Sequence, residues 1–180
     1  MEHINRITEY IDAVATMNVN ADQHAFFEQQ KMDARPVHCV RMCDVFTPGQ
    51  LEIIRDNFKC ERKQCYKNAS LLIQIITHPF GRMMFPAGPV KYIEGFFCEK
   101  DLFPIEHAFV KVGDKYIDPT AERALHLDVR QIEYVSLIEL DAQTMMRYQM
   151  ETGYYGNLYK YHYLTVHHPE FAKKWRELGM

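Results

Sequence analysis

Residues 63–73, KQCYKNASLLI, place a cysteine where a charged segment gives way to an apolar one. Apolar side chains then cover most of a helix circumference as far as residue 76, and a helix that is apolar nearly all round is a buried one. His78 and Pro79 should end it, because the residue before a proline resists the helical backbone conformation. The stretch therefore predicts a buried helix that begins at Cys65.

Helices are also expected upstream of this stretch. INRITEYIDAVATM has Ile4, Ile7 and Ile11 at helical spacing. In TPGQLEIIRDNF, Thr47 is a suitable cap for a helix whose first residue is Pro48. Between them, PVHCVRMCDVF follows a proline and is typical of an extended segment.

Strand patterns dominate the part that follows the buried helix. They occur in VKYIEGFFC at 90–98, PIEHAFVKV at 104–112, KYIDPT at 115–120 and VSLIELD at 135–141. FGRMMFPAGP, at 80–89, is expected to be a loop because of its glycines and prolines. AQTMMRYQMETG and the tail after HHP are expected to be helical.

This order of elements, helices first and then antiparallel strands, is the α+β pattern rather than alternating βαβ units. The expected fold is a buried helix, with the cysteine at its N-terminal end, packed on an antiparallel sheet. We expect one domain over 1–180, with a helical part at 1–58, a core at 60–120, and a strand with C-terminal helices at 121–180.

Charge and hydropathy exclude several classes of function. The net charge of −3, with no basic stripe, argues against nucleic-acid binding. No apolar run is long enough to cross a membrane, and the first residues lack the apolar centre of a signal peptide. The sequence thus predicts a cytoplasmic protein that binds neither nucleic acid nor membrane.

The five cysteines do not suggest a disulfide framework, because their number is odd and no signal peptide precedes them. His38, Cys39 and Cys43 are candidate zinc ligands by residue type, but they lack the close spacing of a zinc knuckle and lie in an apolar run. Buried, inert thiols are the better interpretation of that pair. No metal and no cofactor is expected.

One hairpin brings two polar residues together. EHAFVKV and KYIDPT flank the two-residue loop Gly-Asp, and glycine in the first position is typical of a type II′ turn. Val112 then pairs with Lys115, and counting outward sets Phe109 opposite Asp118. His107 shares the face of Phe109, so Asp118 becomes its diagonal neighbour. A slip of one residue would move Asp118 to the other face.

A histidine held by a carboxylate is suited to activating a thiol. The acid fixes the tautomer and favours the imidazolium, while a helix N-terminus and a nearby imidazolium favour the thiolate of a cysteine. Taken singly, each residue has a plainer interpretation: Cys65 as a core residue, His107 as a hydrogen-bonded histidine and Asp118 as a turn former. Their combination favours a catalytic Cys65, His107, Asp118 triad.

CYKNASLLIQII, VKYIEGFF and PIEHAFVKVGDKYIDPT together resemble the core of the transglutaminase-like cysteine enzymes, within the wider papain-like group. The shared pieces are the cysteine that opens the helix, Gly95 with its aromatic neighbour, the HAF triplet at 107–109 and the DPT triplet at 118–120. Phe109 stands where that family often has tryptophan. The backbone N–H of Cys65, with Gln64 or Gln50, is a candidate oxyanion donor.

The resemblance implies a cysteine hydrolase or acyltransferase that acts on a peptide, a protein or a small amide through a thioester. It leaves open whether water or an amine accepts the acyl group, and it does not specify an oligomeric state, because this fold supports several activities. The alternative is a non-catalytic protein-binding module on the same fold, with Tyr154, Tyr155, Tyr159, Tyr161 and Tyr163 as a recognition surface.

Overall fold

The computed structural model describes residues 6–17, 19–85, 88–100 and 102–178. Its centre is an antiparallel sheet of five strands in the order β1-β5-β2-β3-β4. The strands are β1 (Arg35–Val37), β2 (Val90–Cys98), β3 (Ile105–Val112), β4 (Lys115–Ile117) and β5 (Glu133–Asp141).

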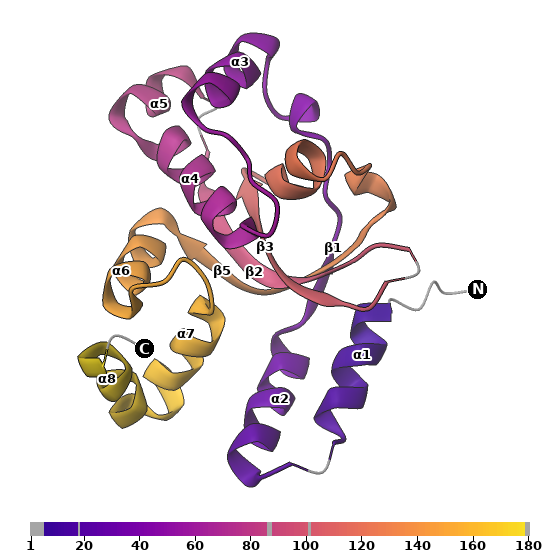
Figure 1. Ribbon diagram of the computed structural model, residues 1–180, viewed down its shortest axis with the longest axis vertical. Coiled ribbons are helices and arrows are strands. Elements are labelled where there is room, and N and C mark those ends of the chain that lie inside the picture. Colours follow the sequence, from indigo (N-terminus) through magenta and orange to yellow (C-terminus); the bar gives the residue numbers. More distant parts are fainter. Residues whose placement is uncertain (1–5, 18, 86–87, 101, 179–180) are drawn as a thin grey trace.

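Three groups of helices surround this sheet in Figure 1: α3 to α5 beyond one end, the α1–α2 pair at the opposite end, and α6 to α8 beside that pair. Short helical turns η1 (Met42–Asp44), η2 (Thr120–Ala124) and η3 (Val129–Gln131) complete the connections. The helices are α1 (Arg6–Ala15), α2 (Ala21–Asp33), α3 (Pro48–Asn57), α4 (Cys65–Thr77), α5 (Pro79–Met84), α6 (Ala142–Thr152), α7 (Leu158–His167) and α8 (Pro169–Leu178).

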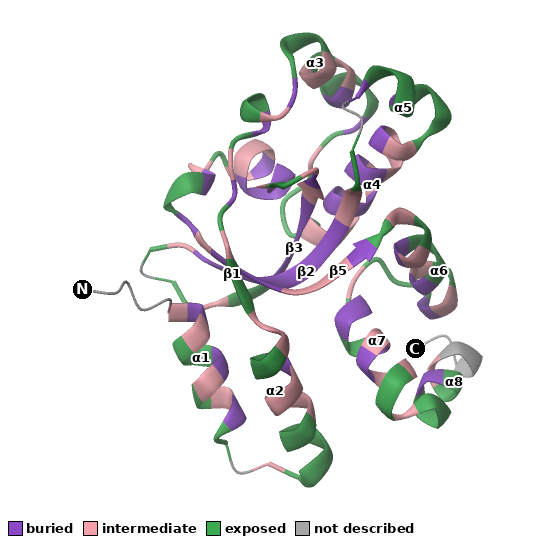
Figure 2. Ribbon diagram, turned by 180° about the vertical axis from the view of Figure 1, so that it is seen from behind, coloured by how far each residue is buried: buried purple, intermediate pink, exposed green. Residues whose placement is uncertain are grey.

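Helix α4 packs on β2 and β3, as the sequence predicts. Its fully buried side chains Leu72 and Ile73 belong to the same apolar cluster as Tyr92, Ala108 and Val110 of the two strands. Figure 2 shows this burial along α4 and the central strands. Removing so much apolar surface from water is the main stabilising contribution to the fold. The α+β class and the helix-on-sheet packing are therefore confirmed.

The opposite face of the sheet carries a second apolar cluster. Ile93, Phe109 and Tyr134 lie there without solvent exposure, covered by Ala121 of η2 and Val129 of η3. Because side chains alternate between faces along a strand, Phe109 and His107 share this face, while Ala108 contacts the α4 side. Each of the two faces of β3 is thus buried by a different set of elements.

Most predicted elements are present, with two corrections. The segment at 80–89, expected to be a loop, contains the helix α5, which begins at Pro79 and is capped by the His78 side chain. The extended segment after Pro36 is strand only at Arg35–Val37, and it continues through a single bridge at Cys39 into the turn η1. The N-terminal part, expected to be helical, therefore also supplies an edge strand. Ile4 lies outside the described residues.

No helix within the described ranges is both long and apolar enough to cross a membrane.

Candidate active site

Cys65 is the first residue of α4, as predicted. Gln64 precedes it as the N-cap but makes no side-chain capping hydrogen bond, so that side chain leaves the N–H groups of the first turn uncapped. Lys63 has a φ of 61°, a left-handed conformation that costs energy in a non-glycine residue and often occurs at functional sites. Cys65 itself is half-buried.

The β3–β4 hairpin has the predicted register. Val112 pairs with Lys115 and Val110 with Ile117, and Gly113 has the positive φ, 62°, that its turn position requires. The ladder ends there, so Asp118 lies just beyond the last pair and the expected pairing with Phe109 does not form. The edge of β3 beside His107 is consequently not covered by β4.

His107 and Asp118 form a buried pair. His107 Nε2 lies 2.7 Å from Asp118 Oδ2, and the two residues are 4% and 0% exposed. This separation is that of a strong, charge-assisted hydrogen bond. The bond uses Nε2, so the Nδ1 atom of the imidazole is available to another group.

The charge of His107 is controlled by its two neighbours. Burial alone lowers the pKa of the imidazole, but the charge and hydrogen bond of Asp118 and the interaction with the Cys65 thiol outweigh burial and raise this pKa to about 10. The Cys65 thiol is one of the groups that raise the His107 pKa, so it lies within interaction range of the imidazole. The structure therefore brings Cys65, His107 and Asp118 together, with the histidine in the middle and held as the imidazolium at neutral pH.

Asp118 is fixed by four hydrogen bonds. Its Oδ1 accepts from the backbone N–H groups of Thr120 and Ala121, at 2.9 and 3.0 Å, and so caps the turn η2. Its Oδ2 accepts from the Tyr134 hydroxyl at 3.0 Å in addition to His107. Asp118 thus forms the turn and also binds the histidine. The sequence offered these two roles as alternatives.

Sequence reasoning missed three residues that hold the site. Tyr134 comes from β5 and Phe97 from β2, where its ring centroid lies 4.6 Å from that of His107. Asn68, buried one turn after Cys65, donates to Thr120 Oγ1 at 3.0 Å and to the backbone of Glu61. It therefore joins the start of α4 to the turn after Asp118. Of the three, only Asn68 has a feature visible in the sequence, since it is a polar residue in the first turns of a helix predicted to be buried.

Gln50, a candidate oxyanion donor, has another role. Its side chain accepts from the Thr47 N–H in the capping box of α3 and donates to the Met84 carbonyl. Gln64, the other candidate, is exposed beside Cys65. The backbone N–H of Cys65 and the Gln64 side chain remain as donors close to the thiol.

The other cysteines differ from Cys65. Burial raises the pKa of the Cys39 thiol, and burial also raises that of Cys60 to about 12, which makes both poor nucleophiles. Cys98 is buried as well, and burial raises its pKa too. Cys43, expected to be buried with Cys39, is instead exposed, because it lies on η1 after the extended segment has ended.

A buried glutamate joins the sheet to α7 near the triad. Glu94, on β2, accepts from the backbone N–H of Tyr159 and from the Tyr92 hydroxyl, each at 2.8 Å. It caps α7, whose own N-cap Asn157 makes no side-chain hydrogen bond. Burial raises the pKa of Glu94 to about 7, although these hydrogen bonds oppose the shift.

The raised pKa of Glu94 predicts that the stability of the protein depends on pH. The folded protein holds the Glu94 proton more tightly than the unfolded chain, because folding raises the pKa from 4.5 to about 7. The resulting stabilisation is complete below pH 4.5 and is lost as the pH rises through 7. We expect Glu94→Gln to remove most of this decline, which amounts to about 3 kcal/mol in the free energy of unfolding. Urea denaturation of both proteins between pH 4.5 and 8 measures it. Parallel curves for the two proteins would contradict the assignment.

Among the residues that the structure describes, no three His, Cys, Asp or Glu side chains are grouped as metal ligands. No family model, no curated protein and no solved structure matches this chain.

Proposed function

We propose that this protein transfers acyl groups through a thioester on Cys65, as a transglutaminase-like cysteine hydrolase or acyltransferase. The observation that carries the proposal is the arrangement Cys65–His107–Asp118, with the 2.7 Å bond between His107 and a buried, fully hydrogen-bonded Asp118. A nucleophile beside a base that a third group orients is the arrangement that covalent acyl transfer requires.

In the proposed reaction, the Cys65 thiolate attacks the carbonyl carbon of an amide or ester. His107, as the imidazolium, gives its proton to the leaving amine or alcohol as the bond to the carbonyl carbon breaks, and the acyl group remains on sulfur. His107 then takes a proton from water or an acceptor amine, which attacks the thioester, and the sulfur leaves as the thiolate that began the cycle. Water gives hydrolysis and an amine gives transamidation or acyl transfer.

The start of α4 supplies the charge stabilisation for this reaction. The backbone N–H of Cys65 lies in a first turn that the Gln64 side chain does not cap, and Gln64 carries a side-chain amide next to Cys65 in the chain. Both are donors for the oxyanion of a tetrahedral intermediate, and the helix dipole acts in the same direction.

The alternative of a non-catalytic binding module has less support. The proposed tyrosine surface is divided: Tyr159, Tyr161 and Tyr163 are buried in helix packing, whereas Tyr154 and Tyr155 are exposed. The five tyrosines therefore do not form one continuous exposed surface, as the module would require. Peptide, protein or small-amide substrates thus remain the proposed partners.

Thiol alkylation tests the proposal. A Cys65 that His107 activates as a nucleophile should react with iodoacetamide at least about tenfold faster than the exposed Cys43. Site-resolved mass spectrometry measures both rates in one sample. In His107→Ala the Cys65 rate should fall to that of Cys43. Equal rates in the wild-type protein would refute the proposal.

A further inference from the structure

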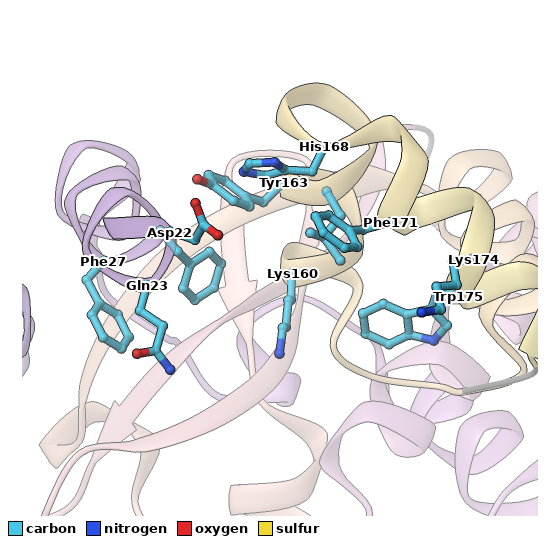
Figure 3. A pocket seen from close by; sticks show the side chains of 11 residues that line it. Asp22, Gln23, Phe27, Lys160, Tyr163, His168, Phe171, Lys174 and Trp175 are labelled. Carbon is cyan, nitrogen blue, oxygen red and sulfur yellow. The ribbon is translucent and has the colours of Figure 1, made fainter. Parts of the chain in front are cut away.

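Two hollows lie between α2 and the C-terminal helices. The outer one, here called the aromatic groove, has a volume of about 670 Å³ and is lined by Phe26, Phe27, Tyr163, Phe171 and Trp175, together with Lys160 (Figure 3). The inner one, here called the inner pocket, has a volume of about 310 Å³ and is lined in part by Tyr66, Glu94, Gly95, Glu106 and Lys160.

The inner pocket adjoins the triad. Tyr66 follows Cys65 in α4, Glu106 precedes His107 in β3, and Gly95 is the residue of β2 that pairs with His107. Cys65 is also close enough to Tyr66 that its charge contributes to raising the Tyr66 pKa, after burial and the charges of Glu94 and Glu106. The lining of the inner pocket thus includes the sequence neighbours of Cys65 and His107 and the strand partner of His107, although neither Cys65 nor His107 lines it.

The two hollows lie next to each other, because Phe26 and Lys160 line both, and they are here together called the channel. On α7 the lining passes from Asn157 in the inner pocket to His168, its C-cap, in the aromatic groove. On α2 it runs the other way, from Gln30 in the inner pocket to Asp22 in the groove. Two antiparallel helices thus form opposite walls, and contact between Phe26 and the Tyr163 ring, with centroids 5.0 Å apart, joins them.

We propose that this channel binds a peptide segment of the acyl substrate, with an aromatic or large aliphatic side chain in the aromatic groove and the reacting carbonyl at Cys65. This inference rests on the proposed function and adds its substrate class. The channel runs along α7 from residue 157 to 168, roughly 16 Å at 1.5 Å per residue, which an extended chain spans with about five residues.

The distribution of polar groups favours a peptide over a fatty acyl chain. The part next to the triad carries Glu94, Glu106 and Lys160, and the apolar part lies farther out. A methylene chain attached to the reacting carbonyl would have to lie against these charged groups, which loses the benefit of burial. A peptide presents amide groups there and places its apolar side chain in the aromatic groove.

Matched electrophiles test the substrate class. The probes are three chloromethyl ketones, carrying acetyl-Phe-Ala-Ala-Ala, acetyl-Ala-Ala-Ala-Ala or decanoyl groups, and the readout is the rate of Cys65 alkylation by mass spectrometry. We expect the phenylalanine probe to react at least tenfold faster than the other two. Phe171→Ala should remove this preference, since Phe171 is half-exposed in the groove and its loss should not disturb the fold. Phe80→Ala, at an exposed phenylalanine on α5, is the matched control and should keep it.

The outcomes separate the two proposals. Equal rates for the two peptide probes, at a Cys65 that reacts readily, would overturn the inference and leave the acyl-transfer function standing. A faster decanoyl probe would replace the peptide with a fatty acyl substrate. A Cys65 inert to all three probes and to iodoacetamide would overturn the proposed function and this inference with it.

Binding without reaction gives a second measurement. Trp175 is the one tryptophan of the chain, and it lines the aromatic groove. In Cys65→Ala, blocked pentapeptides with phenylalanine at either end should change the tryptophan emission at concentrations where an all-alanine pentapeptide does not. No change with either phenylalanine peptide would overturn the inference.

Discussion

Asp118→Asn should slow acylation of Cys65 by about 10⁴-fold while the protein stays folded. The amide nitrogen of asparagine would replace Oδ2, which now accepts from His107 Nε2 and the Tyr134 hydroxyl. That nitrogen donates, so Nε2 would have to accept and the proton would move to Nδ1. The imidazole would then be in the wrong tautomer to accept a proton from the thiol. The charge that raises the His107 pKa would also be lost.

The release of nitrophenolate from p-nitrophenyl acetate measures this effect, after subtraction of the rate in Cys65→Ala. Asp114→Asn is the matched control, since this aspartate is exposed in the turn of the same hairpin and should leave the rate unchanged. The asparagine oxygen can still accept from Thr120 and Ala121, so the circular dichroism spectrum should not change. A loss of less than tenfold would mean that Asp118 only forms the turn.

The parts of the site that sequence predicts are those with local signals. The start of α4 at Cys65 follows from the change from polar to apolar residues and from Pro79 at its far end. The relation of His107 to Asp118 follows from a two-residue turn, because such a turn fixes the register of both strands. That Cys65 meets this pair is predicted from the chemical fit of the three side chains, and the resemblance agrees with it, since no local rule links α4 to β3.

The rest depends on tertiary contacts that leave no pattern in the chain. Tyr134 reaches Asp118 because β5 lies beside β2, an order that strand periodicity does not specify. Glu94 is a charged residue within a strand pattern, and nothing local shows that it is buried as the cap of α7. The channel between α2 and α7 has the same origin, since it is formed by segments more than a hundred residues apart. These contacts complete the site around a triad that local rules only partly define.

Gly95→Ala should destabilise the protein by at least about 3 kcal/mol. Gly95 pairs with His107 on one side and with Ser136 on the other, at the point where the β2–β5 register shifts. A Cβ there would lie 1.9 Å from the backbone oxygen of Val135 and 2.9 Å from its carbonyl carbon. Backbone atoms of a central strand cannot move aside as a flexible side chain can, so β5 would have to separate from β2. Urea denaturation measures the loss.

Gly49→Ala is the matched control, because nothing lies within 4 Å of a Cβ at that position and alanine favours the helix α3. It should be neutral or stabilising by up to about 1 kcal/mol. Equal unfolding midpoints for the two variants would show that the sheet accommodates the methyl group. If Gly95→Ala retains a folded fraction, its Cys65 should also react more slowly with iodoacetamide, since the strand that carries His107 pairs directly with the displaced backbone. The close approach at Gly95 would then serve the position of the imidazole as well as the packing of the sheet.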